Sequence, residues 1–131
     1  MRIVVDTNVL VRYLVADDPV QHAASVRTIE SGDDIVLPTI VLCETVWVLS
    51  RAYRYGKDEI ARALRLVIES SNTITDRPAA EAGLDLLSRG GDFADGTIAQ
   101  EVERSRADHV VTFDQSFARL ADPGVVRLIE P

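Results

Sequence analysis

Short apolar segments alternate with helix-length segments along this chain, and several of the apolar segments end at an acidic residue. The segments that read as strands are residues 2–5, 35–37, 73–75, 108–113 and 125–129. Strands separated by helices imply parallel βαβ units with right-handed crossovers. We therefore expect a single α/β domain over residues 1–131, with three α/β/α layers around a central parallel sheet of about four to five strands.

Helix signals fill the segments between these strands. Asp18 is expected to cap one helix, and Thr39 is expected to cap a long helix that ends near Tyr55, with Gly56 just beyond it. In the following helix, apolar residues recur on one face at Ile60, Leu64, Val67 and Ile68. Further helices are predicted over residues 8–15, 76–89, 94–106 and 115–120.

Composition narrows the class of protein. The 21 acidic residues outnumber the 14 basic ones and give a net charge of −7, which argues against a general nucleic-acid coat protein because neutralising phosphates needs basic patches. Divalent ions bound to the acids would weaken that objection. No apolar run approaches the roughly 20 residues that span a bilayer. With no secretory signal at the start and a single cysteine, Cys43, we expect a cytoplasmic protein without membrane contact.

Four acidic residues stand at ends of apolar segments or inside one. Asp6 and Asp114 follow predicted strands, Asp95 begins a predicted helix, and Glu44 lies within an apolar helical segment. The carboxyl ends of parallel strands share one edge of a sheet, where ligands bind. Carboxylates gathered there repel one another unless a cation neutralises them, and their oxygens suit Mg²⁺ or Mn²⁺. The set predicts a metal site.

The first two of these acids also have simpler interpretations. One interpretation of Asp6 is that it does no more than cap the helix that follows it. In the other, Asp6 has a functional role, and Asn8 beside it orients its carboxylate through a hydrogen bond. Glu44 interrupts an apolar stripe of its helix. Its carboxylate could lie exposed at the edge of the stripe, pair with an arginine, or bind a metal ion.

The acidic residues in the second half of the chain can also be interpreted either as helix caps or as metal ligands. Asp92 and Asp95 are three residues apart, on one side of a first helical turn, where acids also complement the helix dipole. Asp114 could simply start a short helix, and the nearby Thr112 hydroxyl could bind a carboxylate or a metal-bound water. The metal hypothesis depends on the set, since several independent caps converging on one edge would be a coincidence.

Residues 51–57 combine basic and aromatic side chains, as a surface that contacts phosphates or bases could. The alternative, which we favour from the sequence, is that these cations complement a helix dipole.

The sequence argues against several other phosphate-binding classes. The chain has no glycine-rich nucleotide-binding loop. A dehalogenase-type phosphatase would need an acid where Asn8 stands, and a phosphate receiver would need a lysine late in the chain, whereas the only lysine is Lys57.

The order and spacing of these motifs carry a family resemblance. The motifs are Val-Asp-Thr-Asn-Val-Leu at residues 5–10, Leu-Cys-Glu at 42–44, Asp-Phe-Ala-Asp at 92–95 followed by Ile-Ala at 98–99, and Thr-Phe-Asp at 112–114. Together they resemble PIN-domain proteins, in particular the VapC-like toxins of bacterial toxin–antitoxin pairs, over essentially the whole chain. One departure is Gly96, where alanine is more usual; it costs a helix roughly 1 kcal/mol and is expected to loosen the turn carrying Asp95.

The resemblance implies a divalent-metal-dependent endoribonuclease that hydrolyses RNA, forms a homodimer and is silenced by a cognate antitoxin. It implies that Mg²⁺ or Mn²⁺ is held by Asp6, Glu44, Asp95 and Asp114, with Asn8, Asp92 and Thr112 in support. The alternative is a non-catalytic RNA- or protein-binding module in which the acids only cap helices. Divalent-metal binding distinguishes the two hypotheses.

Overall fold

The computed structural model describes residues 1–131, and the chain forms two compact units, Met1–Asp76 and Arg77–Pro131. The first unit contains the strands β1 (Arg2–Val4), β2 (Asp34–Val36) and β3 (Thr73–Ile74). Its helices are α1 (Thr7–Leu14), α2 (Pro19–Ile29), α3 (Thr39–Arg51) and α4 (Lys57–Ile68). The second unit consists of α5 (Arg77–Ser88), α6 (Phe93–Ser105), β4 (Val110–Thr112), α7 (Gln115–Leu120) and β5 (Val126–Leu128). The predicted alternation of strands and helices is confirmed.

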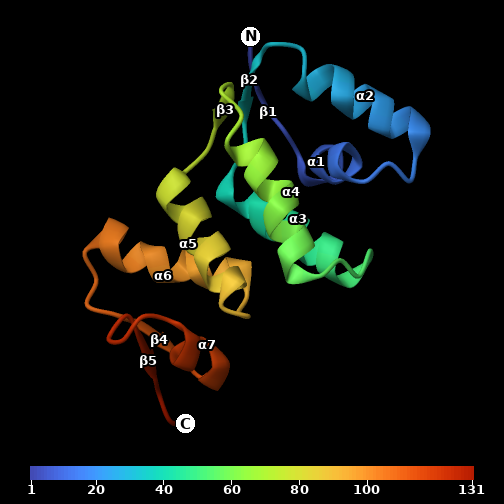
Figure 1. Ribbon diagram of the computed structural model, residues 1–131. Helices are drawn as coiled ribbons and strands as arrows, with labels where there is room; N and C mark the ends of the chain where they lie inside the picture. The colour runs from blue at the N-terminus through green and yellow to red at the C-terminus, as the bar shows by residue number, and fades with distance from the viewer. The chain divides into compact units, whose positions relative to one another are not determined.

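The first unit is built around a three-stranded parallel sheet in the order β1-β2-β3 (Figure 1). Ile35 of the central strand pairs with Ile3 on one side and Thr73 on the other. Helix α1 packs on α2 and α3, and α3 packs on α4. Apolar side chains from these elements form the core, including Leu10, Leu42 and Leu64, which are fully buried.

Local signals correctly predict the start of α2 and the buried face of α4. The Asp18 carboxylate accepts a 3.1 Å hydrogen bond from Gln21 N, so Asp18 caps α2 as expected. The predicted apolar face of α4 is also confirmed, because Ile60, Leu64, Val67 and Ile68 are all buried. Caps and apolar spacing act over a few residues, which makes them readable from sequence.

Both predicted ends of α3 are wrong. Pro38 occupies the N-cap position and Thr39 is the first helical residue, without a side-chain cap. The helix ends at Arg51, and Arg54 rather than a glycine adopts the left-handed conformation, with φ of 56°. Gly56 precedes α4 instead, and its N–H donates a 3.0 Å hydrogen bond to Glu59 Oε1 in the first turn of that helix. The chain therefore leaves α3 before it reaches Gly56, the residue from which the sequence predicted the end of this helix.

The second unit pairs β4 with β5 in parallel and packs α5 tightly against α6 (Figure 1). Phe93 at the start of α6 is fully buried and its ring lies against Gly83 of α5. A Cβ at Gly96 would lie 2.7 Å from Gly83 Cα and would collide with the carbonyl of Ala82. Gly96 therefore allows close approach of the two helices, which is a different role from the loosened turn expected from its helix propensity.

The architecture agrees with the predicted α/β class. The strands form one three-stranded and one two-stranded parallel sheet, and a single central sheet of four to five strands remains a prediction. None of the helices is long and apolar enough to cross a membrane.

Candidate functional site

In the first unit, Thr7 joins the two predicted acidic residues. Val5 is buried at the end of the first strand segment, and Asp6 then caps α1. Asp6 Oδ1 accepts a 2.8 Å hydrogen bond from Thr7 N. The hydroxyl of the same threonine donates a 2.8 Å hydrogen bond to Glu44 Oε1 on α3. The packing of α1 on α3 thus brings Asp6 and Glu44 to the same residue.

The surroundings of Glu44 show whether its carboxylate is buried or exposed, which the sequence left open. Glu44 is exposed, and it shares its side of α3 with the exposed residues Ile40 and Trp47. It is therefore not a buried charge within the core. Asn8 is also exposed, and no hydrogen bond joins its side chain to Asp6 or Glu44. Thr7 makes the orienting contact that the sequence suggested for Asn8.

In the second unit, the predicted acidic residues Asp92 and Asp114 lie within electrostatic reach of Asp95. Asp92 occupies the N-cap position of α6 without making a side-chain cap hydrogen bond, and Asp95 lies in the first turn. Burial of the Asp95 carboxyl raises its pKa above the ordinary value, and repulsion from Asp92 and Asp114 raises it further. Asp95 is half-buried, whereas the other two are exposed. The Asp95 carboxylate is therefore repelled by two neighbouring carboxylates.

Two hydrogen bonds hold Asp114 in place, one through its backbone N–H and one through its carboxylate at the start of α7. Its Oδ1 accepts a 3.1 Å hydrogen bond from Phe117 N, and its own N–H donates a 3.0 Å hydrogen bond to Thr112 Oγ1. Asp6 and Asp114 are therefore both helix caps, as the simpler interpretation required. In each residue the cap hydrogen bond involves Oδ1, so capping leaves Oδ2 able to bind another group.

The donor chemistry of these residues fits a hard divalent cation better than a soft one. All the candidate side-chain ligands are carboxylates, which favour Mg²⁺ and Mn²⁺, and the thiol and imidazole ligands preferred by zinc are not among them. The clustered charges around Asp95 would be neutralised by a cation. Within neither unit, however, is a group of three or more His, Cys, Asp or Glu side chains arranged to hold a metal ion.

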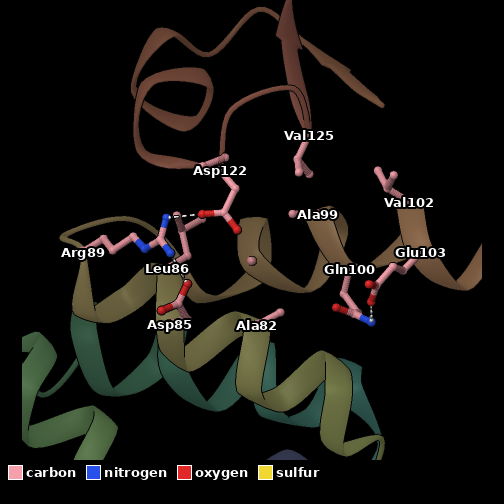
Figure 2. Close-up of a pocket in the computed structure, with 12 residues that line it drawn as sticks. Ala82, Asp85, Leu86, Arg89, Ala99, Gln100, Val102, Glu103, Asp122 and Val125 are labelled. Carbon is pink, nitrogen blue, oxygen red and sulfur yellow. Dashed lines mark hydrogen bonds and ion pairs between the residues drawn. The ribbon is translucent and has the colours of Figure 1, made fainter. Parts of the chain in front are cut away.

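A cavity of about 210 Å³ in the second unit contains none of the predicted acids (Figure 2). At one end of it, Arg89 forms ion pairs of 3.0 Å with Asp85 and 2.8 Å with Asp122. Farther along, Gln100 donates a 3.1 Å hydrogen bond to Glu103 (Figure 2). The charged side chains that line this cavity are therefore engaged in ion pairs or hydrogen bonds with one another.

Thr7 is the functional candidate that sequence reasoning missed. The only available signal was its place between Asp6 and Asn8 in the first motif. Its partner Glu44 lies 37 residues away, so the hydrogen bond could be recognised only in the structure.

Comparison with protein-family models matches residues 3–123 to the model described as PIN domain. A search of curated proteins gave no match. The matched region begins within β1 and extends through α7, so it includes every acidic residue discussed above.

Proposed function

Because this chain belongs to the PIN domain family, whose members are typically metal-dependent nucleases, we propose that it is a divalent-metal-dependent endoribonuclease. In this proposal it is a VapC-like toxin that hydrolyses RNA phosphodiester bonds and is inhibited by a cognate antitoxin. The carrying observation is that predicted site acids are neighbours within each unit. Asp6 and Glu44 both contact Thr7, and Asp95 is repelled by Asp92 and Asp114.

The proposed ligands of Mg²⁺ or Mn²⁺ are Asp6, Glu44, Asp95 and Asp114, with Asn8, Asp92 and Thr112 in supporting roles. The bound ion would lower the pKa of a water molecule and stabilise negative charge in the transition state. The chain's own residues supply orientation. The hydroxyl of Thr7 fixes the Glu44 carboxylate, and the Thr112 hydroxyl fixes the backbone of Asp114. Orientation of this kind matters because metal affinity depends on the hydrogen bonds that hold the ligands.

The remaining parts of the proposal concern assembly. We propose a cytoplasmic homodimer, an antitoxin that covers apolar surface, and a single sheet formed by all five strands. Exposed apolar side chains support these ideas. Val4 on β1 is 69% exposed and Val111 on β4 is 58% exposed, and apolar strand residues of this kind favour burial against other structure.

The first test is RNA cleavage in bacterial cells that express the wild-type chain, the Asp95→Asn variant or the Asp108→Asn variant. Asp108 is an exposed aspartate of the same unit outside the proposed site, so it controls for loss of one charge. We expect new RNA 5′ ends carrying phosphate with wild type and Asp108→Asn, and none with Asp95→Asn. Equal cleavage by all three proteins, each folded by circular dichroism, would contradict the assignment of Asp95.

One alternative function has a specific observation in its favour. Asp6 and Asp114 both cap helices, as expected if the chain were a non-catalytic module that binds RNA or protein. Calorimetric titration of purified protein with Mn²⁺ distinguishes the two hypotheses. Saturable binding that Asp95→Asn abolishes supports the nuclease, and no binding by the wild type supports the module.

A further inference from the structure

Helix α3 has a buried face and an open face. The buried face consists of Val41, Leu42, Thr45, Val46 and Leu49. The open face carries Glu44, Trp47 and Arg51, which are spaced at i, i+3 and i+7 and therefore align along one side of the helix. From Glu44 to Arg51 this row rises roughly 10 Å along the axis. The row connects a proposed site residue to an aromatic and a basic side chain.

Trp47 is the most unusual member of this row. Its side chain is 62% exposed, although indole is one of the largest apolar groups available to a core. The guanidinium of Arg51 lies 6.0 Å from the ring centroid, at the outer limit of a cation–π contact. This pair presents an aromatic surface beside a positive charge, which is the combination that binds an unpaired base and its phosphate.

The segment between Glu44 and Asp58 is basic, in contrast to the net charge of the whole protein. Residues 45–57 contain no acidic residue and three basic ones, Arg51, Arg54 and Lys57, in a chain of net charge −7. Arg51 and Arg54 are exposed and take part in none of the salt bridges that hold Arg12, Arg89 and other arginines. Their charges are therefore available to an anionic ligand.

We propose that this open face of α3 binds single-stranded RNA, with a base stacked on Trp47 and phosphates contacted by Arg51 and Arg54. The proposal rests on the proposed nuclease function and extends it by naming the residues that position the substrate. The RNA strand would follow α3 toward Glu44, so that the phosphodiester adjoining the stacked base lies at the acidic residues. Trp47 and Arg51 are positioning residues in this account and do not take part in the chemistry.

Charge supports RNA as the occupant of this face. The guanidinium groups of Arg51 and Arg54 are exposed and complementary to phosphate, and basic side chains that neutralise phosphates release counterions on binding. In a twofold-symmetric antiparallel pair centred on the row, Glu44 would face Arg51 of the other copy, so the experiment must distinguish RNA from a second copy of the chain.

The sole tryptophan of the chain makes the test direct, because all indole fluorescence comes from Trp47. The protein is the full-length Asp95→Asn variant in chelator, so that binding is measured without cleavage. The probe is a single-stranded RNA of mixed sequence carrying a terminal dye. We expect RNA to quench Trp47 emission, and we expect added salt to reverse the quenching.

Substitutions in the same background then identify the contacts by polarisation of the dye. Trp47→Leu should weaken binding roughly 5- to 150-fold, the range for loss of one stacked base. Arg51→Gln should weaken binding of all RNA sequences alike and lower the salt slope by about one. Arg62→Gln is the matched control, since Arg62 is an exposed arginine of α4 in the same unit. It should bind RNA as tightly as its parent.

Cleavage assays with active protein separate this inference from the nuclease proposal. If the wild type cleaves RNA but Trp47→Leu and Arg51→Gln leave KM unchanged, the face is not the RNA surface, although the nuclease assignment stands. If RNA quenches Trp47 but no RNA is ever cleaved, the RNA surface stands and the nuclease assignment fails. Emission that shifts with protein concentration and ignores RNA would show that a second chain covers this face, which would overturn the inference.

Discussion

Thr7 Oγ1 donates a 2.8 Å hydrogen bond to Glu44 Oε1 and so fixes a carboxylate of α3 to the first turn of α1. Thr7 makes a second hydrogen bond, because its backbone N–H donates to Asp6. One residue therefore determines how two proposed metal ligands are oriented. This relationship yields the first prediction.

Thr7→Val should lower Mn²⁺ affinity and RNA cleavage about 10- to 100-fold, the usual effect of removing a hydrogen bond that orients a metal ligand. Valine keeps the shape of threonine but cannot donate to Glu44. Thr7→Ser retains the hydroxyl and serves as the matched control. Calorimetry with Mn²⁺ and initial cleavage rates provide the measurements, and equal losses in both variants would assign the effect to packing.

Asp95→Asn should stabilise the metal-free protein at neutral pH. The pKa of Asp95 is raised by burial first and then by Asp92 and Asp114. Between the unfolded and folded pKa values the folded state binds more protons, so stability falls as pH rises through that interval. Removing the charge should abolish that fall and raise Tm by a few degrees above the interval.

Thermal unfolding in chelator across acidic to neutral pH measures this effect. Added Mg²⁺ should raise the Tm of the wild type, because a ligand that binds only the folded state stabilises it. The same Mg²⁺ should leave Asp95→Asn unchanged. A lower Tm for the variant in chelator would mean that Asp95 stabilises the fold by itself, and the metal hypothesis would lose its electrostatic support.

Gly96→Ala should destabilise the protein by about 1–3 kcal/mol, the usual cost of overpacking. Alanine is the better helix former by about 1 kcal/mol, but its Cβ would collide with Ala82 and Gly83 on α5. Urea unfolding measures the change. Gln100→Ala and Gln100→Gly, compared at a half-buried position of the same helix, calibrate helix propensity alone. A gain in stability at Gly96 would show that α5 and α6 can separate at little cost.

Tyr53→Phe should destabilise the protein more at neutral pH than in acid. The Tyr53 hydroxyl donates a 2.8 Å hydrogen bond to Asp17, and this bond is the main cause that lowers the Asp17 pKa. Arg12 lowers it further. A carboxyl with a lowered folded pKa stabilises the fold above its unfolded pKa, and that stabilisation disappears as pH falls through the folded value.

Carbon-detected NMR titration should therefore show a higher Asp17 pKa in Tyr53→Phe than in the wild type. The difference in unfolding free energy between the two proteins should shrink as pH falls. Tyr55→Phe is the control, because Tyr55 is a neighbouring half-buried tyrosine outside this hydrogen-bonded network. A stability difference independent of pH would assign the role of the Tyr53 hydroxyl to the 3.2 Å hydrogen bond that it accepts from Arg12, and not to Asp17.

Short-range signals in the sequence determined the order and type of the elements. Asp6, Asp18 and Asp114 cap helices because a carboxylate can reach backbone N–H groups only one to three residues away. The apolar spacing of α4 similarly reports one face of a helix. These features depend on neighbours in the chain, so no knowledge of packing is needed to predict them.

Tertiary packing decided the features that depend on distant residues. The sequence left open whether Glu44 was buried, and only the packing of α1 on α3 placed it on an open face against Thr7. Gly96 looked like a weak point of its helix, and only the approach of α5 gave it a steric role. Such contacts join residues far apart in the chain and depend on how whole helices pack, which no local pattern encodes.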